Sequence, residues 1–98
     1  MSLPVSFHAL AERELNDAAQ FYETQNPGLG AAFLDDAERC AASVAAHPRS
    51  GRAILGKIRR RLLRRFPYAV IYKVRPDSIR ILAMMNLRRQ PHYWVGRE

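Results

Sequence analysis

Cysteine and long apolar runs are the two things this sequence most clearly lacks. Its 98 residues contain one cysteine, Cys40, so an intramolecular disulfide is excluded. A lone thiol is typical of proteins kept in a reducing cytosol. No stretch approaches the roughly 18 consecutive apolar residues that a membrane-spanning helix needs. We therefore expect a cytoplasmic protein with no membrane partner.

Motifs for metal binding and catalysis are also missing. The three histidines, His8, His47 and His92, are far apart, and no histidine, cysteine or carboxylate set has the spacing of a metal site. There is no glycine-rich phosphate loop. The acidic residues fall mostly at surface spacing on predicted helices, which argues against a paired-carboxylate site. The sequence predicts no metal and no cofactor, and leaves arginine, histidine and tyrosine as the side chains that could carry chemistry.

Acidic residues are absent from the middle of the chain, between Glu38 and Asp77. The first 48 residues carry seven acids against two arginines, a net charge of −5, whereas the last 50 carry fourteen Lys and Arg against two acids, a net charge of +12. This split indicates a basic face built by the second half and suited to nucleic acid or to an acidic protein. The alternative is a solvated basic surface without a dedicated partner.

The first half of the chain predicts a short strand followed by two helices. Residues 5–7 alternate as a strand does, and apolar residues then recur at helical spacing over about 9–25 and 29–46. Asn26-Pro27-Gly28 separates the two periodic segments, because proline cannot continue a helix. Two amphipathic helices joined by so short a link predict an antiparallel helical hairpin.

The second half predicts a sheet. After an expected loop over residues 48–56, three segments have β patterning, at 58–65, 69–75 and 78–85. Their short connections require antiparallel pairing. The order β-α-α-β-β-β predicts one α+β domain, residues 1–98, with the helical hairpin packed on one face of a small antiparallel sheet. Cys40 lies on the apolar stripe of the second helix, so we expect it in the core.

The densest charged feature is the run from residue 57 to 65, with six cations in nine positions. One interpretation is an edge strand protected by charge against self-association. The other is a surface that binds a polyanion or an acidic partner. On this second interpretation the candidate partner-binding residues are Lys57, Arg59, Arg61 and Arg65.

A second feature, residues 86–97, interleaves cations with the rings of His92, Tyr93 and Trp94. Arginine beside aromatic rings is the composition of a nucleotide-stacking site. A C-terminal segment that packs back on a sheet needs the same rings, and for Trp94 packing is favoured. The candidate partner-binding residues of this segment are Arg88, Arg89, Trp94 and Arg97.

At several places the sequence resembles the ParE branch of the RelE/ParE toxin superfamily. Residues 66–72, FPYAVIY, resemble that branch's FPY-x-[VI]-x-Y segment. Residues 77–83, then 88–94 and Arg97, are similar to its I-x-I-L-A…R-R-x-P-x-Y-W-x-x-R ending. Upstream, Phe21-Tyr22-Glu23, residues 26–30 and Phe33-Leu34 match its helix–turn–helix. The match covers almost the whole chain in order.

The resemblance implies a plasmid-stabilisation toxin of a type II toxin–antitoxin system. Such a toxin is silenced by a cognate antitoxin with an acidic C-terminal region, which allows a toxin–antitoxin hetero-oligomer. ParE-type members poison DNA gyrase without cleaving a substrate. RelE-type members are ribosome-dependent, metal-independent endoribonucleases that cleave mRNA with basic residues and a C-terminal Tyr or His. The loosely corresponding catalytic candidates here are Arg61, Arg80, Arg88, His92 and Tyr93.

One departure from the ParE pattern bears on that choice. Asn86 stands where a histidine is frequent after the last strand, which removes one titratable group, although His92 could substitute. We therefore expect a gyrase-binding toxin that is not an enzyme, with the ribosome-dependent endoribonuclease as the alternative.

Overall fold

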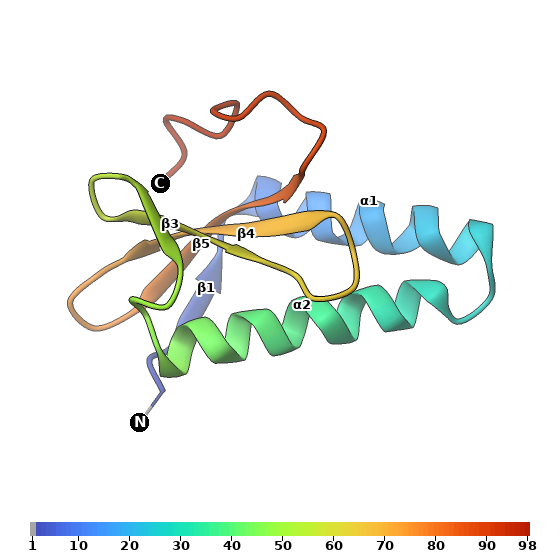
Figure 1. The fold of residues 1–98 in the computed structure, drawn as a ribbon, viewed down its shortest axis with the longest axis horizontal. Helices are drawn as coiled ribbons and strands as arrows, with labels where there is room; N and C mark the ends of the chain where they lie inside the picture. The colour runs from blue at the N-terminus through green and yellow to red at the C-terminus, as the bar shows by residue number, and fades with distance from the viewer. Residues whose placement is uncertain (1) are drawn as a thin grey trace.

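The computed structural model describes residues 2–98 as two layers, a helical hairpin and a five-stranded sheet (Figure 1). Its elements are β1 (Val5–Phe7), α1 (Ala9–Gln25), α2 (Leu29–Ala46), β2 (Arg52–Leu55), β3 (Ile58–Leu62), β4 (Tyr68–Val74) and β5 (Ile79–Asn86). The strands lie in the order β1-β5-β4-β3-β2. The α+β prediction is confirmed, and both helices have the predicted bounds.

The sheet differs from the expected one in two respects. The segment expected as a loop contains β2, which pairs antiparallel with β3. In addition, β1 pairs parallel with β5, in the register Val5 with Ile79, so the sheet is mixed. The argument from short connections applied to neighbouring strands alone. Nothing in it constrained β1, whose partner lies at the far end of the chain.

Strand β3 ends at Leu62, three residues before the expected end, because a helix carboxylate holds the following turn. Asp36 of α2 is 5% exposed, and its carboxylate accepts the backbone N–H groups of Arg64 at 3.2 Å and Arg65 at 2.8 Å. These two N–H groups therefore cannot form the inter-strand hydrogen bonds that would extend β3. The β3–β4 turn is fastened to α2 at this point.

The core lies on both faces of the sheet. Toward the helices, Phe33 and Val44 of α2 pack with buried residues such as Val70, Tyr72 and Ile81. On the opposite face, buried residues of β4 and β5 pack with a ring from the C-terminal tail, in a cluster that includes Ile71, Leu82, Met85 and Trp94. The central strands are therefore apolar on both sides. Cys40 is 8% exposed in the helix-side core, as predicted.

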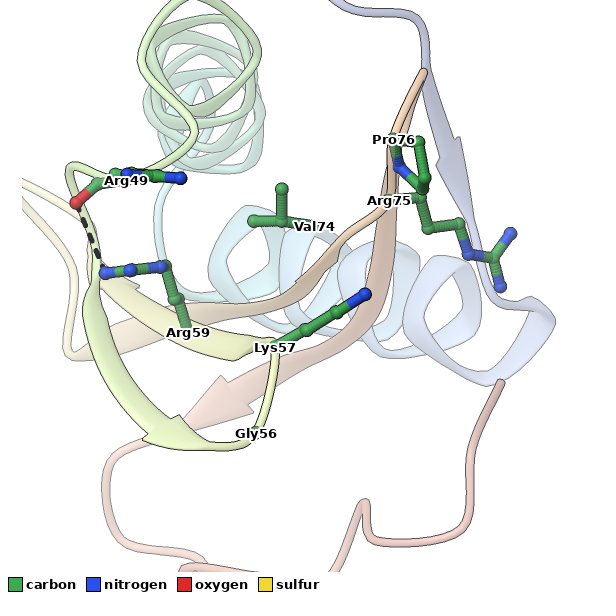
Figure 2. A pocket seen from close by; sticks show the side chains of 7 residues that line it. All are labelled: Arg49, Gly56, Lys57, Arg59, Val74, Arg75 and Pro76. Atoms are coloured by element: carbon green, nitrogen blue, oxygen red, sulfur yellow. Dashed lines mark hydrogen bonds between the residues drawn. The ribbon is translucent and has the colours of Figure 1, made fainter.

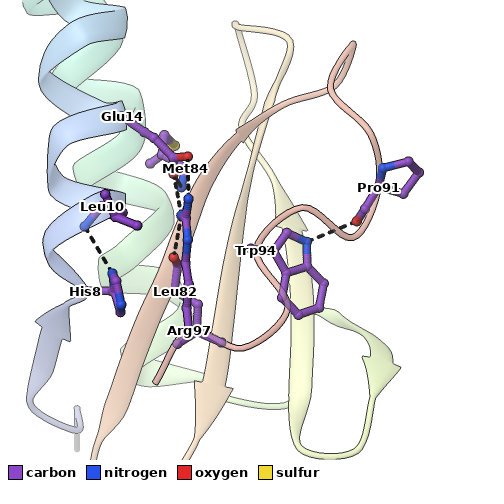
Figure 3. Close-up of polar contacts among 8 residues, drawn as sticks. All are labelled: His8, Leu10, Glu14, Leu82, Met84, Pro91, Trp94 and Arg97. Carbon is purple, nitrogen blue, oxygen red and sulfur yellow. Dashed lines mark hydrogen bonds and ion pairs between the residues drawn. The ribbon is translucent and has the colours of Figure 1, made fainter.

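Strand β1 has three residues, so it leaves part of the outer edge of β5 without a strand partner. Two side chains cover this part: Arg97 donates to the backbone oxygen of Leu82 at 3.0 Å, and Glu14 of α1 accepts the backbone N–H of Met84 at 3.1 Å (Figure 3). The two side chains also pair with each other at 3.0 Å. This contact anchors the tail to both α1 and β5.

Neither α1 nor α2, the helices of residues 2–98, has the length and apolar character of a membrane-spanning helix.

Candidate functional site

The most strongly charged part of the molecule is the segment that contains β2 and β3, residues 49–61, which we call the basic ribbon. It holds six cations and no acid: Arg49, Arg52, Lys57, Arg59, Arg60 and Arg61. The two strands are joined by a tight turn at Gly56-Lys57, where Gly56 has a φ of +55° that favours glycine. Because side chains alternate along a strand, the ribbon presents cations on both faces.

On the helix-side face, the ribbon borders a cavity of about 430 Å³ (Figure 2). Arg49 and Arg59 lie on one side of it and Arg75 on the other, with Lys57 between them. The guanidinium of Arg59 donates to the backbone oxygens of Arg49 at 3.3 Å and Gly51 at 2.8 Å, so its position is fixed without its charge being neutralised. Four cations and no carboxylate line this cavity.

On the opposite face, Arg52 and Arg60 are directly opposite each other in the β2–β3 register. Both line a cleft of about 320 Å³ whose other wall includes Pro91 and His92 of the tail. No carboxylate lines this cleft either. It offers an anion two guanidinium groups beside the His92 ring.

The structure brings together part of the first predicted set. Lys57 and Arg59 share the helix-side cavity, and Arg61, on the same face, donates to Ser50 Oγ at 2.7 Å. Arg65 lies apart at the β3–β4 turn, with its guanidinium 5.8 Å from the Phe66 ring centre.

Sequence reasoning missed four cations of the site: Arg49, Arg52, Arg60 and Arg75. The acid-free stretch from residue 39 to 76 was the signal that contains them. Arg52 and Arg60 were missed because residues 52–55 were expected to be a loop, so the pairing of these two arginines across β2 and β3 was not predicted.

The second predicted set divides into buried and exposed members. Trp94 is 1% exposed, which confirms the packing interpretation, and its Nε1 donates to the Pro91 backbone oxygen at 3.1 Å. Arg97 is engaged with Glu14. Arg88 and Arg89 are exposed, and the Arg89 guanidinium lies 4.1 Å from the centre of the Tyr93 ring. The exposed cations of the tail are therefore Arg88 and Arg89, at the start of this segment.

The catalytic candidates are not gathered in one place. Arg61 lies beside Cys40 on the helix side of the sheet, whereas Tyr93 packs on the other side. Arg80 donates to the backbone oxygen of Phe7 at 3.1 Å. Arg88 and His92 are exposed, and the His92 ring packs edge-on against Trp94 at 5.9 Å.

Tyr93 is half-buried, and the guanidinium groups of Arg89 and Arg97 lie 4.1 Å and 5.1 Å from the centre of its ring. Its hydroxyl is buried and has no hydrogen-bond partner. Burial raises the pKa of Tyr93, and the neighbouring Glu14 carboxylate raises it further. Within residues 2–98 no three His, Cys, Asp or Glu side chains cluster as metal ligands.

The family model described as "ParE toxin of type II toxin-antitoxin system, parDE" matches residues 5–91. The chain belongs to the ParE toxin family. The model of this ParE family ends before Tyr93, Trp94 and Arg97, so the anchored end of the tail lies beyond the match. The resemblance of the sequence to the ParE branch is confirmed.

A solved structure described as "Chromosomal ParDE TA system from P. aeruginosa" has the same fold as this ParE-family chain. The TM-score is 0.77 at 18% identity, and the alignment covers 89% of this chain and 98% of that one. No curated protein matches the chain.

Proposed function

We propose that this ParE-family chain is a cytoplasmic toxin that inhibits DNA gyrase by binding it, without cleaving a substrate. The observation that carries the proposal is the scatter of the catalytic candidates, with Arg61 and Tyr93 on opposite sides of the sheet. Binding requires a charged surface with fixed side chains, and the basic ribbon has both.

The chemistry of the candidates favours binding over RNA cleavage. Cleavage without a metal needs a proton acceptor, a proton donor and cations around one phosphate. Arginines supply the cations but stay protonated near neutral pH. Tyr93 has a raised pKa and a buried hydroxyl, which leaves His92 as the one candidate acceptor. A single exposed histidine without a positioned partner is weak support for a nuclease.

We further propose a cognate antitoxin whose acidic C-terminal region covers part of the basic half, in a toxin–antitoxin hetero-oligomer. The charge of the second half favours such a partner. The outer edge of β2 has no strand partner in the sheet order and can accept an added strand. The adjacent gene product should co-purify with the toxin and restore growth. If the two proteins do not associate at low salt, this proposal is wrong.

The choice of target is tested by inducing the toxin and following DNA and protein synthesis together. Gyrase poisoning should give DNA breaks, filamentation and an SOS response while translation continues at first. Purified toxin should inhibit supercoiling by gyrase. Prompt loss of translation, with mRNA cut at codons in the ribosomal A site, would instead establish the endoribonuclease.

A further inference from the structure

The cations of the basic ribbon have no acidic partners. In the described chain, residues 2–98, the one ion pair is Arg97 with Glu14, and it belongs to the tail. Arg52 and Arg60 face each other across the two strands, an arrangement of like charges that destabilises a sheet. An anion bound between the two guanidinium groups would reverse the sign of this interaction.

The ribbon carries this charge on both of its faces and at its tip. Arg59 pairs in register with Tyr72, on the helix side, whereas Arg60 pairs with Ile71, on the tail side. Each face borders its own acid-free hollow, of about 430 Å³ and 320 Å³. Lys57 is exposed at the turn between the strands. Figure 2 shows this turn projecting beside the helix-side cavity.

This two-sided arrangement selects the kind of partner. An acidic peptide would lie along one face or add to the outer edge of β2, and would leave the other face without counter-charge. The groove of a nucleic acid duplex has rows of phosphates on both sides, and the major groove of B-form DNA admits a two-stranded ribbon. We propose that the basic ribbon enters a groove of duplex DNA and contacts backbone phosphates with both faces.

The contacts of the ribbon fit such a role. Arg59 and Arg61 are held by Gly51 and Ser50, so the base of the ribbon is fixed before any partner arrives. Arg52 and Lys57 are exposed and free to reach phosphates. Because phosphates carry no sequence information, this binding should be independent of base sequence and strongly dependent on salt. The inference goes beyond the proposed function, since it concerns DNA alone and requires no gyrase.

The test is binding of the purified toxin to a labelled 20-base-pair duplex, measured by fluorescence anisotropy over a salt series. The tail-side variant is R52Q/R60Q and the helix-side variant is R49Q/K57Q, two exposed ribbon cations that line the helix-side cavity. Arg59 and Arg61 are left intact because their guanidinium groups hold Gly51 and Ser50 at the base of the ribbon. The control, R13Q/R39Q, removes the same charge from exposed positions on α1 and α2. Circular dichroism melts are used to check that every variant is folded.

Each ribbon variant should lower the slope of log affinity against log salt by about 2, one for each lost phosphate contact, and the control should leave it nearly unchanged. If the control lowers this slope by the same amount, binding depends on net charge alone, and the proposal is wrong. So would an effect of one ribbon variant alone, since both faces must contribute. Binding of poly-glutamate but not of the duplex would show that the ribbon recognises an acidic peptide. Supercoiling inhibition by the same variants is scored separately, so failure of DNA binding does not count against gyrase as the target.

Discussion

Single side chains decide what the tail of this molecule can do. Tyr93 packs against two guanidinium groups and has an unpartnered hydroxyl, and Trp94 lies in the tail-side core. Both were predicted from the sequence as either stacking or packing residues. The sequence favoured packing for Trp94, and the structure confirms it. It could not decide for Tyr93, because that role depends on Glu14, which lies 79 positions away and fixes Arg97 beside the ring.

Replacement of Tyr93 by Phe tests the role of that hydroxyl. Because the hydroxyl has no hydrogen-bond partner, its loss should change the free energy of unfolding by less than about 0.5 kcal/mol and leave toxicity intact. The control is Tyr72→Phe, whose hydroxyl donates to the Pro48 backbone oxygen and accepts the N–H of Gly51. That change should cost about 1–3 kcal/mol. Loss of toxicity in a stably folded Tyr93→Phe protein would argue for the nuclease.

Cys40 gives the folded state a pH dependence. Burial raises the pKa of the thiol from 9.0 to about 11. The unfolded chain therefore loses this proton first as pH rises. The stabilisation is intact below about pH 9 and falls away by roughly 2–3 kcal/mol between pH 9 and 11. Urea unfolding across this range should show a decline that is smaller by this amount in Cys40→Ala. Equal declines in the two proteins would contradict the assignment.

At the scale of elements, local signals were sufficient for the helices and insufficient for the sheet edges. The apolar period and the Asn26-Pro27-Gly28 breaker gave both helices their bounds. Strand β2 has four residues and no alternation of apolar and polar side chains, so no local pattern marked it. The parallel pairing of β1 depends on contacts across the whole chain, which no local pattern contains.

The turn after β3 depends on one helix carboxylate. Replacing Asp36 by Ala leaves two backbone N–H groups, of Arg64 and Arg65, without an acceptor. We expect a loss of about 2–3 kcal/mol in the free energy of unfolding and faster hydrogen exchange at these two amides. The neighbouring exposed Asp35, changed to Ala, is the matched control and should be nearly neutral. A neutral Asp36 variant would show that the turn holds without α2.

The uncovered edge of β5 gives a second prediction at this scale. Glu14→Ala removes the acceptor of the Met84 N–H and leaves the half-buried Arg97 without its carboxylate. This should cost about 3 kcal/mol in thermal unfolding experiments, because a partly buried charge loses its partner. Asp17→Ala, on the same helix and exposed, serves as the control. If the two variants melt alike, the tail is not anchored through Glu14.

For the whole molecule, the sequence predicted the sign of the surface and the structure gives its distribution. The acid-free middle of the chain indicated a basic face. Folding turns that face into a ribbon with charge on two sides, because β2 and β3 form the free margin of the sheet, away from the acidic α1. Net charge alone contained no information on this distribution of charge, because the distribution depends on which strand lies at the edge of the sheet.

The parallel pairing of β1 with β5 also sets the order in which parts of the molecule fold. Val5 meets Ile79, 74 positions later, so the first strand must wait for the last before it has a partner. The helical hairpin can form early from local contacts, but closure of the sheet carries the entropy cost of a long loop and should be the slow step. A nascent chain cannot complete this closure until its C-terminal segment has left the ribosome. The complete sheet therefore forms only after β5 has been synthesised.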